Sequence, residues 1–144
     1  MRKRETLKAG CVVVDINSKK IALIYRKKKN DYEFPKGHLE LNENLMQCAI
    51  RETAEEIKRD VKVCENVKPF EIIYHNKKDG RCRVYYYLAV DLKPSDNKST
   101  DTHDLIWTDY KSVESYLTYK TGKNVWQHFY KKILDLQNLT KLMM

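Results

Sequence analysis

The sequence predicts an α/β sandwich built around a mixed β-sheet. Short apolar runs rich in β-branched residues occur on both sides of one helical segment that contains neither Gly nor Pro. A second helical region follows towards the end of the chain. The order strands, helix, strands and helices within 144 residues is typical of a single domain, which we take as residues 1–144.

The first apolar segments predict a β-hairpin. Residues 10–16 form a β-branched run, Asn17 and Ser18 give a turn signal, and residues 21–25 form the returning strand. A basic loop at residues 26–30 follows the hairpin.

The next segment, residues 44–57, predicts a helix because it is rich in Ala, Glu, Leu and Gln. The later segment 81–92 alternates and then becomes strongly apolar, so we expect a long central strand. An apolar stripe along the last helix predicts that it packs on the core. The other expected elements are strands at 61–64, 70–75 and 105–108, a polar loop at 94–102, and helices at 111–119 and 124–142.

Basic side chains outnumber acidic ones by 28 to 20, which gives a formal net charge of +8. Such an excess is typical of proteins that bind a polyanion: nucleic acid, an acidic membrane surface or a phosphate-rich small molecule. The alternative is a solvated surface with a compositional bias. With 42% hydrophobic and 33% charged residues, the composition indicates a globular protein rather than a disordered or membrane one.

The cysteines indicate a reducing compartment. No two of them lie two to four residues apart, which excludes the usual zinc spacing, and all lie in apolar stretches. No apolar stretch approaches the roughly 20 residues of a membrane span, and the basic residues 1–4 are not followed by a signal-peptide core. We therefore expect a protein of the cytoplasm, or alternatively the nucleus, with no membrane partner. The cysteines are Cys11, Cys48, Cys64 and Cys82.

Three carboxylates share one face of the 44–57 helix. Glu52, Glu55 and Glu56 are related by steps of three and four residues. Clustered carboxylates repel one another unless a cation lies among them, and hard oxygen ligands suit Mg²⁺ or Mn²⁺. Taken alone, the cluster is more often a solvated helix face.

The surrounding spacing changes that interpretation. Gly37 is followed after five residues by Glu43, after seven more by Arg51-Glu52, and then after two by Glu55-Glu56. This pattern resembles the signature of the Nudix hydrolases. The family usually has Gly where Lys58 stands, as the left-handed residue that ends the helix.

The resemblance implies a Nudix-type α/β/α sandwich with a catalytic loop–helix–loop that hydrolyses a diphosphate linkage with Mg²⁺ or Mn²⁺. It further implies that the three glutamates are metal ligands or the general base, and that the Gly37 carbonyl adds a ligand. Glu43 and Arg51 would stabilise the loop–helix–loop through contact with each other.

Two subgroups of the family share features with this chain. Pro35-Lys36-Gly37-His38 resembles the dinucleoside polyphosphate (Ap4A-type) hydrolases. Residues 76–87 and 107–129 instead resemble the diphosphoinositol polyphosphate phosphohydrolases. Both subgroups act on small polyphosphorylated molecules.

Basic and aromatic residues outside the helix are candidates for binding such a substrate. Loops carrying Arg26 to Lys29 and Lys77 to Arg83 would form a positive funnel if both border the site. Tyr32, Tyr74, Tyr85 and Tyr87 could stack on a nucleobase, although alternate tyrosines in a strand are more often packing residues. Many family members have a further carboxylate before the last strand, here Asp101 or Asp104. The candidate substrate-binding residues are Lys8, Arg26, Tyr32, Lys36, His38, Lys78, Arg81 and Arg83.

Two alternatives remain open at this point. A hydrolase of the same fold could act on capped RNA or on nucleoside triphosphates, including oxidised ones, since the basic charge suits an RNA backbone. A binding module could recognise a phosphorylated ligand without catalysis, but the complete glutamate cluster argues against it. The sequence does not indicate an oligomeric state.

Overall fold

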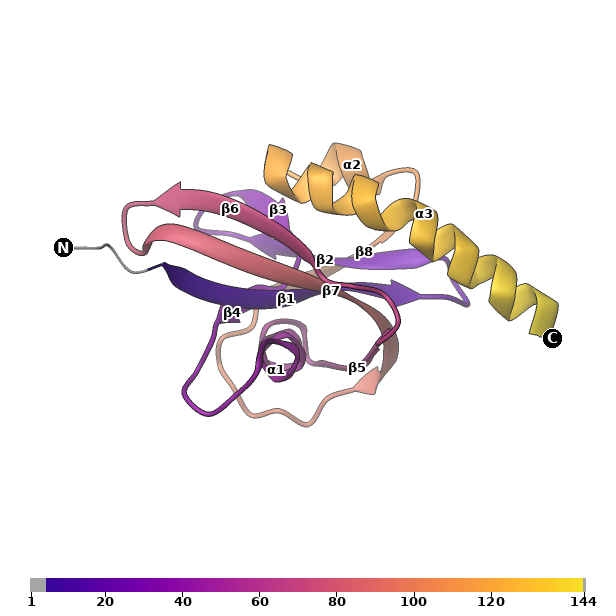
Figure 1. Cartoon of the computed structure of the whole chain (residues 1–144), viewed down its shortest axis with the longest axis horizontal. Helices are drawn as coiled ribbons and strands as arrows, with labels where there is room; N and C mark the ends of the chain where they lie inside the picture. The colour runs from indigo at the N-terminus through magenta and orange to yellow at the C-terminus, as the bar shows by residue number, and fades with distance from the viewer. Residues whose placement is uncertain (1–4, 144) are drawn as a thin grey trace.

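The computed structural model, which describes residues 5–143, has a mixed β-sheet between two helical layers (Figure 1). Helix α1 (Leu45–Ile57) lies on one face of the sheet, and α2 (Val113–Tyr116) and α3 (Lys120–Met143) lie on the other. This arrangement confirms the predicted α/β sandwich. The basic residues 1–4 lie outside the described residues.

The main path of the sheet has the order β3-β2-β1-β7-β5, and three more strands pair off this path. Strands β1 and β7 run parallel, whereas the other pairs are antiparallel, so the sheet is mixed. The strands are β1 (Thr6–Asp15), β2 (Lys20–Arg26), β3 (Asp31–Glu33), β4 (Lys36–His38), β5 (Arg59–Val63), β6 (Phe70–Asn76), β7 (Gly80–Pro94) and β8 (Asp104–Asp109).

Both faces of β1 are buried, which explains its continuous apolar run. Val12 and Val14 belong to the core beneath α3, and Cys11 and Val13 belong to the core beneath α1. The apolar stripe predicted along the last helix comprises Val125, Phe129, Ile133 and Leu136. The first three pack into the first of these cores together with Trp126, and Leu136 is half-buried.

Strand β1 forks between two partners. Its end pairs with β2, where Val14 faces Ile21, whereas its first half pairs with β4, where Ala9 faces Gly37. The two backbones approach closely here, because a Cβ added to Gly10 would overlap the Pro35 carbonyl. The fork brings the segment around Gly37, where the Nudix-like signature begins, against the sheet and next to α1.

Helix α1 has well-defined ends. Asn44 and Gln47 form a capping box, in which each side chain accepts from the other residue's backbone N–H. Lys58 ends the helix in the left-handed region, at φ 55° and ψ 41°. A non-glycine residue there costs about 1 kcal/mol, so the departure from Gly noted in the sequence is a real backbone strain.

Several expected bounds differ in the structure. The helix expected at residues 111–119 is wrong: only Val113–Tyr116 is helical, because Leu117 turns to extended backbone at φ −59° and ψ 126°. Thr118 then pairs with Tyr32 of β3 through two hydrogen bonds. Helix α3 begins at Lys120 rather than at residue 124. Strands β3 and β4 have three residues each and are too short for a periodic signal.

The cysteines are unpaired and mostly buried, as expected: Cys11, Cys48 and Cys82 are buried and Cys64 is half-buried. Among residues 5–143, helices long and apolar enough to span a membrane are absent.

Candidate active site

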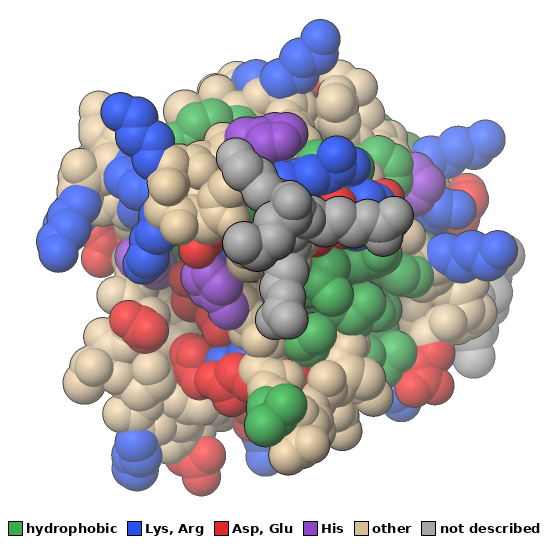
Figure 2. Space-filling model, turned by 60° about the vertical axis from the view of Figure 1, so that its left-hand side comes forward, with side chains coloured by type: hydrophobic (Ala, Val, Ile, Leu, Met, Phe, Trp, Pro, Cys, Tyr) green, Lys and Arg blue, Asp and Glu red, His purple; other side chains and the backbone are tan. Residues whose placement is uncertain are grey.

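A cavity of about 710 Å³ opens where β1, β4 and the β6–β7 hairpin approach the start of α3. Glu52 and Glu56 of α1 and Gly37 of β4 line it. On the face that Figure 2 presents, acidic side chains gather beside histidines, and Lys and Arg side chains lie around the edge. The fork of β1 therefore places the glutamate helix and the basic segments around one hollow.

Of the three clustered glutamates, Glu52 and Glu56 reach this cavity and Glu55 does not line it. The Arg51 guanidinium holds two of them, with Nη1 at 2.8 Å from Glu52 Oε1 and at 3.2 Å from Glu55 Oε2. It also binds Glu43 through two hydrogen bonds, of 2.7 and 3.0 Å. Arg51 is not a lining residue, but its contact fixes the orientation of Glu52, which lines the cavity.

Gly37 and Glu52 are in close contact. A Cβ added to Gly37 would overlap the Glu52 carboxylate, so a larger residue would displace it. The Gly37 carbonyl accepts a weak hydrogen bond from the buried Cys48 thiol, with Sγ and O 3.6 Å apart. Burial of this thiol raises its pKa to about 12, so it remains protonated and can donate.

Glu56 is held by two elements outside its own helix. One oxygen, Oε1, accepts from the backbone N–H of Lys36 at 2.7 Å. The other, Oε2, lies 3.5 Å from Nε2 of His103, and this contact raises the pKa of His103. The Glu56 side chain is only 12% exposed. Its orientation therefore depends on β4 and on the loop that precedes β8.

The carboxylates of Glu52 and Glu56, which both line the cavity, are suitable ligands for a divalent cation. Burial raises the pKa of Glu52 to about 7, and the charges of Glu56 and Glu55 add to this effect against the opposing contact with Arg51. A cation would relieve the cost of these partly buried charges. Within residues 5–143 no group of three His, Cys, Asp or Glu side chains is arranged to hold a metal. One or two carboxylates suffice for Mg²⁺ when water and phosphate oxygens complete its shell.

The cavity also contains cations matched by carboxylates. Lys36 Nζ lies 3.0 Å from Glu33, and Arg26 binds Asp31 at 2.6 Å and Glu33 at 3.4 Å. Burial alone would lower the pKa of Lys36, but the charge of Glu33, its hydrogen bond and the nearby Tyr86 and Tyr74 together outweigh burial, so the pKa is raised and the ammonium stays charged.

Two predicted substrate-binding side chains, Lys8 and His38, contact Asp79 at the tip of the β6–β7 hairpin. Its carboxylate lies 3.1 Å from Lys8 Nζ and 3.2 Å from His38 Nε2. Lys8 also donates to the Tyr74 hydroxyl at 2.9 Å. These contacts overcome the opposing effect of burial and hold the pKa of Asp79 well below its usual range. An anion of the protein itself thus lies between two predicted substrate-binding residues.

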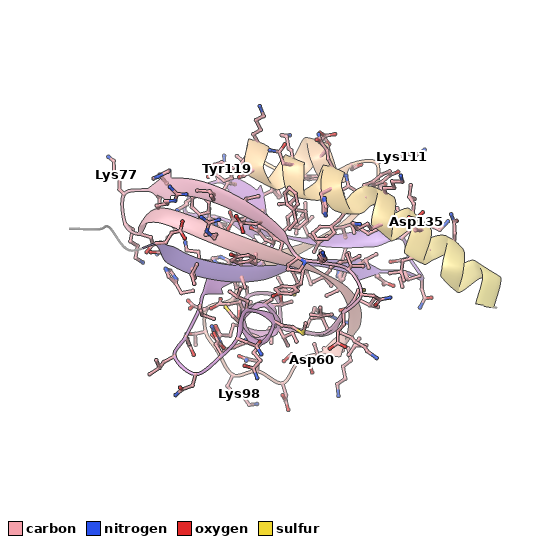
Figure 3. The ribbon with its side chains drawn as sticks, in the orientation of Figure 1. Asp60, Lys77, Lys98, Lys111, Tyr119 and Asp135 are labelled. Carbon is pink, nitrogen blue, oxygen red and sulfur yellow. The ribbon has the colours of Figure 1, made fainter. Side chains whose placement is uncertain are left out.

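The basic residues of the hairpin separate into two sets. Lys77 and Lys78 line the cavity, and Figure 3 shows Lys77 at the hairpin tip. Arg81 and Arg83 are not among the lining residues: both bind Glu5, at 2.8 and 2.9 Å, and Arg83 also binds Glu71. The structure therefore brings together only part of the expected basic funnel.

Tyrosine rings form part of the cavity wall. Tyr32, Tyr74, Tyr86 and Tyr119 line it, whereas Tyr85 and Tyr87 do not. The Tyr32 ring packs against Tyr25, with ring centroids 4.8 Å apart. Tyr119, at the start of α3 (Figure 3), donates from its hydroxyl to Asp31 at 2.5 Å. Contacts with Tyr25 and Asp31 therefore fix two of the aromatic side chains of this wall.

The loop before β8 contributes two lining residues, Asp101 and His103. Asp104 instead begins β8 and pairs with Lys27 at 3.8 Å. His103 was not expected from the sequence, although it lies between the two aspartates that drew attention to this loop. Glu33, Asp79 and Tyr119 also lack a sequence pattern that singles them out, because only the fold brings them to the cavity.

An α/β sandwich with a glutamate helix beneath a short loop–strand segment defines a class of hydrolase domains. The NUDIX domain model matches residues 5–131, and the chain belongs to the Nudix hydrolase family. No curated protein sequence matches the chain.

Solved structures share the fold at low sequence identity. An Ap4A hydrolase from C. elegans superposes with a TM-score of 0.76 at 23% identity, covering 90% of this chain and 98% of that one. A NUDIX hydrolase from Nitrosomonas europaea gives 0.73 at 13% identity, covering 90% of both chains. The E. coli dihydroneopterin triphosphate pyrophosphohydrolase gives 0.63 at 14%, covering 85% and 93%. These likenesses establish the fold.

Proposed function

We propose that this protein is a metal-dependent pyrophosphohydrolase that cleaves a phosphoanhydride bond of dinucleoside polyphosphates. The observation that carries this proposal is that Glu52 and Glu56 open onto the same cavity as charged Lys36 and four tyrosine residues. A nucleotide requires aromatic faces for its base and cations for its phosphates. The similarity to an Ap4A hydrolase supports this substrate class.

In this proposal, Glu52, Glu56 and the Gly37 carbonyl would hold Mg²⁺ or Mn²⁺. The bound cation would neutralise phosphate oxygens and lower the pKa of an attacking water. Arg51 keeps Glu52 oriented, and the Lys36 backbone N–H and His103 keep Glu56 oriented. A carboxylate of this pair accepts a proton from the water.

The remaining steps fall to Lys and His side chains that line the cavity. Lys36, Lys8 and His38 bind phosphate oxygens and so align the anhydride with the water. A P–O bond to water forms, and the bridging P–O bond breaks with its electron pair going to the leaving phosphate. Both products are then phosphorylated nucleosides that leave through the open side of the cavity.

A panel of substrates with Mg²⁺ or Mn²⁺ tests this function. The purified chain is expected to hydrolyse diadenosine tetra-, penta- or hexaphosphate, and water labelled with ¹⁸O should place the label in one phosphate product. The Glu56→Gln variant removes the negative charge but keeps the shape, so it should lose at least about 100-fold in kcat. Absence of turnover on every diadenosine polyphosphate would refute the proposal.

Diphosphoinositol polyphosphates are the second candidate, because the cavity wall also includes Lys77 and Lys78 of the β6–β7 hairpin. An inositol ring crowded with phosphates needs many such cations. The panel therefore includes a diphosphoinositol polyphosphate, together with capped RNA and nucleoside triphosphates. A higher kcat/KM for the inositol compound would replace the first candidate with the second.

A further inference from the structure

The loop at residues 95–103 is fixed along the C-terminal end of helix α1. Ser95 N–H donates to the Lys58 carbonyl at 2.9 Å, and His103 N–H donates to the Glu56 carbonyl at 3.0 Å. The Thr102 hydroxyl donates to the Glu55 carbonyl at 3.3 Å. These bonds satisfy carbonyls that a helix end leaves without intrahelical partners. The loop is therefore part of the structure that ends the catalytic helix.

Lys58 connects the middle of this loop to the helix. Its ammonium donates to the Asn97 carbonyl at 3.1 Å and also to the Ser99 carbonyl. The loop's own bonds are short-range: Asn97 N–H to Ser95 Oγ, and Ser99 N–H to Asn97 Oδ1. The Lys58 side chain therefore joins Asn97 and Ser99 to the helix and bridges the part of the loop between its two attached ends.

The backbone conformation of Lys58 adds a second observation. It lies in the left-handed region, where Gly is favoured and where this family usually has Gly. A glycine would end the helix without strain but would have no ammonium for the loop carbonyls. The strained residue therefore contributes a contact that glycine cannot make.

The far end of the loop reaches the candidate metal ligand. His103 follows the segment that Lys58 holds, and its Nε2 lies 3.5 Å from Glu56 Oε2. Asp101, two residues earlier, lines the same cavity. In Figure 1 this loop passes beside α1 on its way to β8, and in Figure 3 Lys98 projects from it.

We propose that Lys58 is a positioning residue for Glu56, which acts by holding the 95–103 loop so that His103 contacts that carboxylate. The catalytic consequence depends on the proposed function, because Glu56 acts on substrate only if the chain is a metal-dependent hydrolase. The tether itself and its effect on a metal ion can be measured without turnover.

Two substitutions separate the tether from the backbone strain. Lys58→Met keeps the strained conformation and the aliphatic stem but loses the ammonium. Lys58→Gly also loses the ammonium but relieves the strain. Relative to the unsubstituted protein, the free energy of unfolding should therefore fall for Lys58→Met and rise for Lys58→Gly. The matched control is Lys19→Gly, because Lys19 has the same left-handed backbone, with φ 56°, in the β1–β2 turn.

The first measurement is the rate at which trypsin cuts after the exposed Lys98 in the native protein. Release of the loop should accelerate this cut about tenfold in both Lys58 variants. The second is the dissociation constant for Mn²⁺ by titration calorimetry, which should rise about threefold to tenfold. The third is kcat, which should fall by a similar factor with little change in KM. Lys19→Gly should match the unsubstituted protein in all three.

The outcomes are distinct. If Lys58→Gly keeps the original cutting rate and Mn²⁺ affinity, the tether is refuted. If cutting accelerates but Mn²⁺ affinity and kcat do not change, Lys58 holds the loop without positioning Glu56, and the proposal is overturned. If the unsubstituted chain hydrolyses no diphosphate, the proposed function fails, while trypsin and Mn²⁺ still decide the role of Lys58.

Discussion

Arg51 and Glu43 are joined side by side by two hydrogen bonds, from Nε to Oε2 at 3.0 Å and from Nη2 to Oε1 at 2.7 Å. Paired bonds of this kind are the strong form of an ion pair. They fasten the loop before α1 to the same guanidinium that holds Glu52 and Glu55. The pair therefore links helix stability to carboxylate orientation.

Replacement of Glu43 by Gln should lower the free energy of unfolding by about 1–3 kcal/mol at pH 7. The contact with Arg51 lowers the pKa of Glu43 to about 2, from an ordinary 4.5. Because the folded pKa is the lower one, its contribution is complete above pH 4.5 and disappears as the pH falls towards 2. Urea unfolding across this range checks the prediction, and a constant difference between the two proteins would contradict it.

The Gly37→Ala substitution should reduce kcat/KM by at least about 100-fold. The added methyl would overlap the Glu52 carboxylate, so that side chain must move away from its present position. Steady-state kinetics and Mn²⁺ titration measure the two consequences. Thermal unfolding is the control and shows whether the variant still folds. A folded variant with undiminished Mn²⁺ affinity would disprove the assigned contact.

Replacement of Asp79 by Asn should lower KM by about threefold to tenfold with little change in kcat. The carboxylate competes with substrate phosphates for Lys8 and His38, and the amide removes its charge while preserving its shape. The Asn variant keeps the backbone N–H that donates to Asn76, so the turn should persist. A raised KM would mean that Asp79 orients Lys8 and His38 instead of competing with substrate for them.

Two double substitutions distinguish the cations of the β6–β7 hairpin. Removing Lys77 and Lys78 by Ala should raise KM about threefold to tenfold, because both line the cavity and attract an anionic substrate. Removing Arg81 and Arg83 should leave KM within about twofold, since both bind Glu5. Kinetics at low and moderate salt compare the pairs. Equal effects of both pairs at both salt concentrations would contradict the distinction.

The glutamate helix could be predicted from sequence because its chemistry depends on local spacing. Glu52, Glu55 and Glu56 share one face of α1 because they are three and four residues apart. The Glu43–Arg51 contact and a left-handed residue at position 58 are expected from the resemblance to the Nudix signature. Spacing along one helix is converted directly into spacing in space.

The substrate side of the site could be predicted only in part, because it depends on which strand face points to the cavity. Arg81 and Arg83 share a face of β7 with Tyr85, whereas Tyr86 points to the cavity. The alternation in this part of β7 separates the two faces, but the sequence alone does not show which face borders the cavity. Asp79 contacts His38, 41 positions away, and His103 contacts Glu56, 47 positions away. No local sequence pattern connects residues so far apart.

The fork in β1 also determines where this chain tolerates changes in length. The turn at residues 27–30 lies outside the paired segments of β2 and β3, so extra residues there would extend the rim without altering strand register. An extra residue between Pro35 and Gly37 would instead shift β4 against β1 and turn Lys36 to the opposite face. Engineering of substrate range should therefore lengthen the outer turns and leave the three-residue strand unchanged.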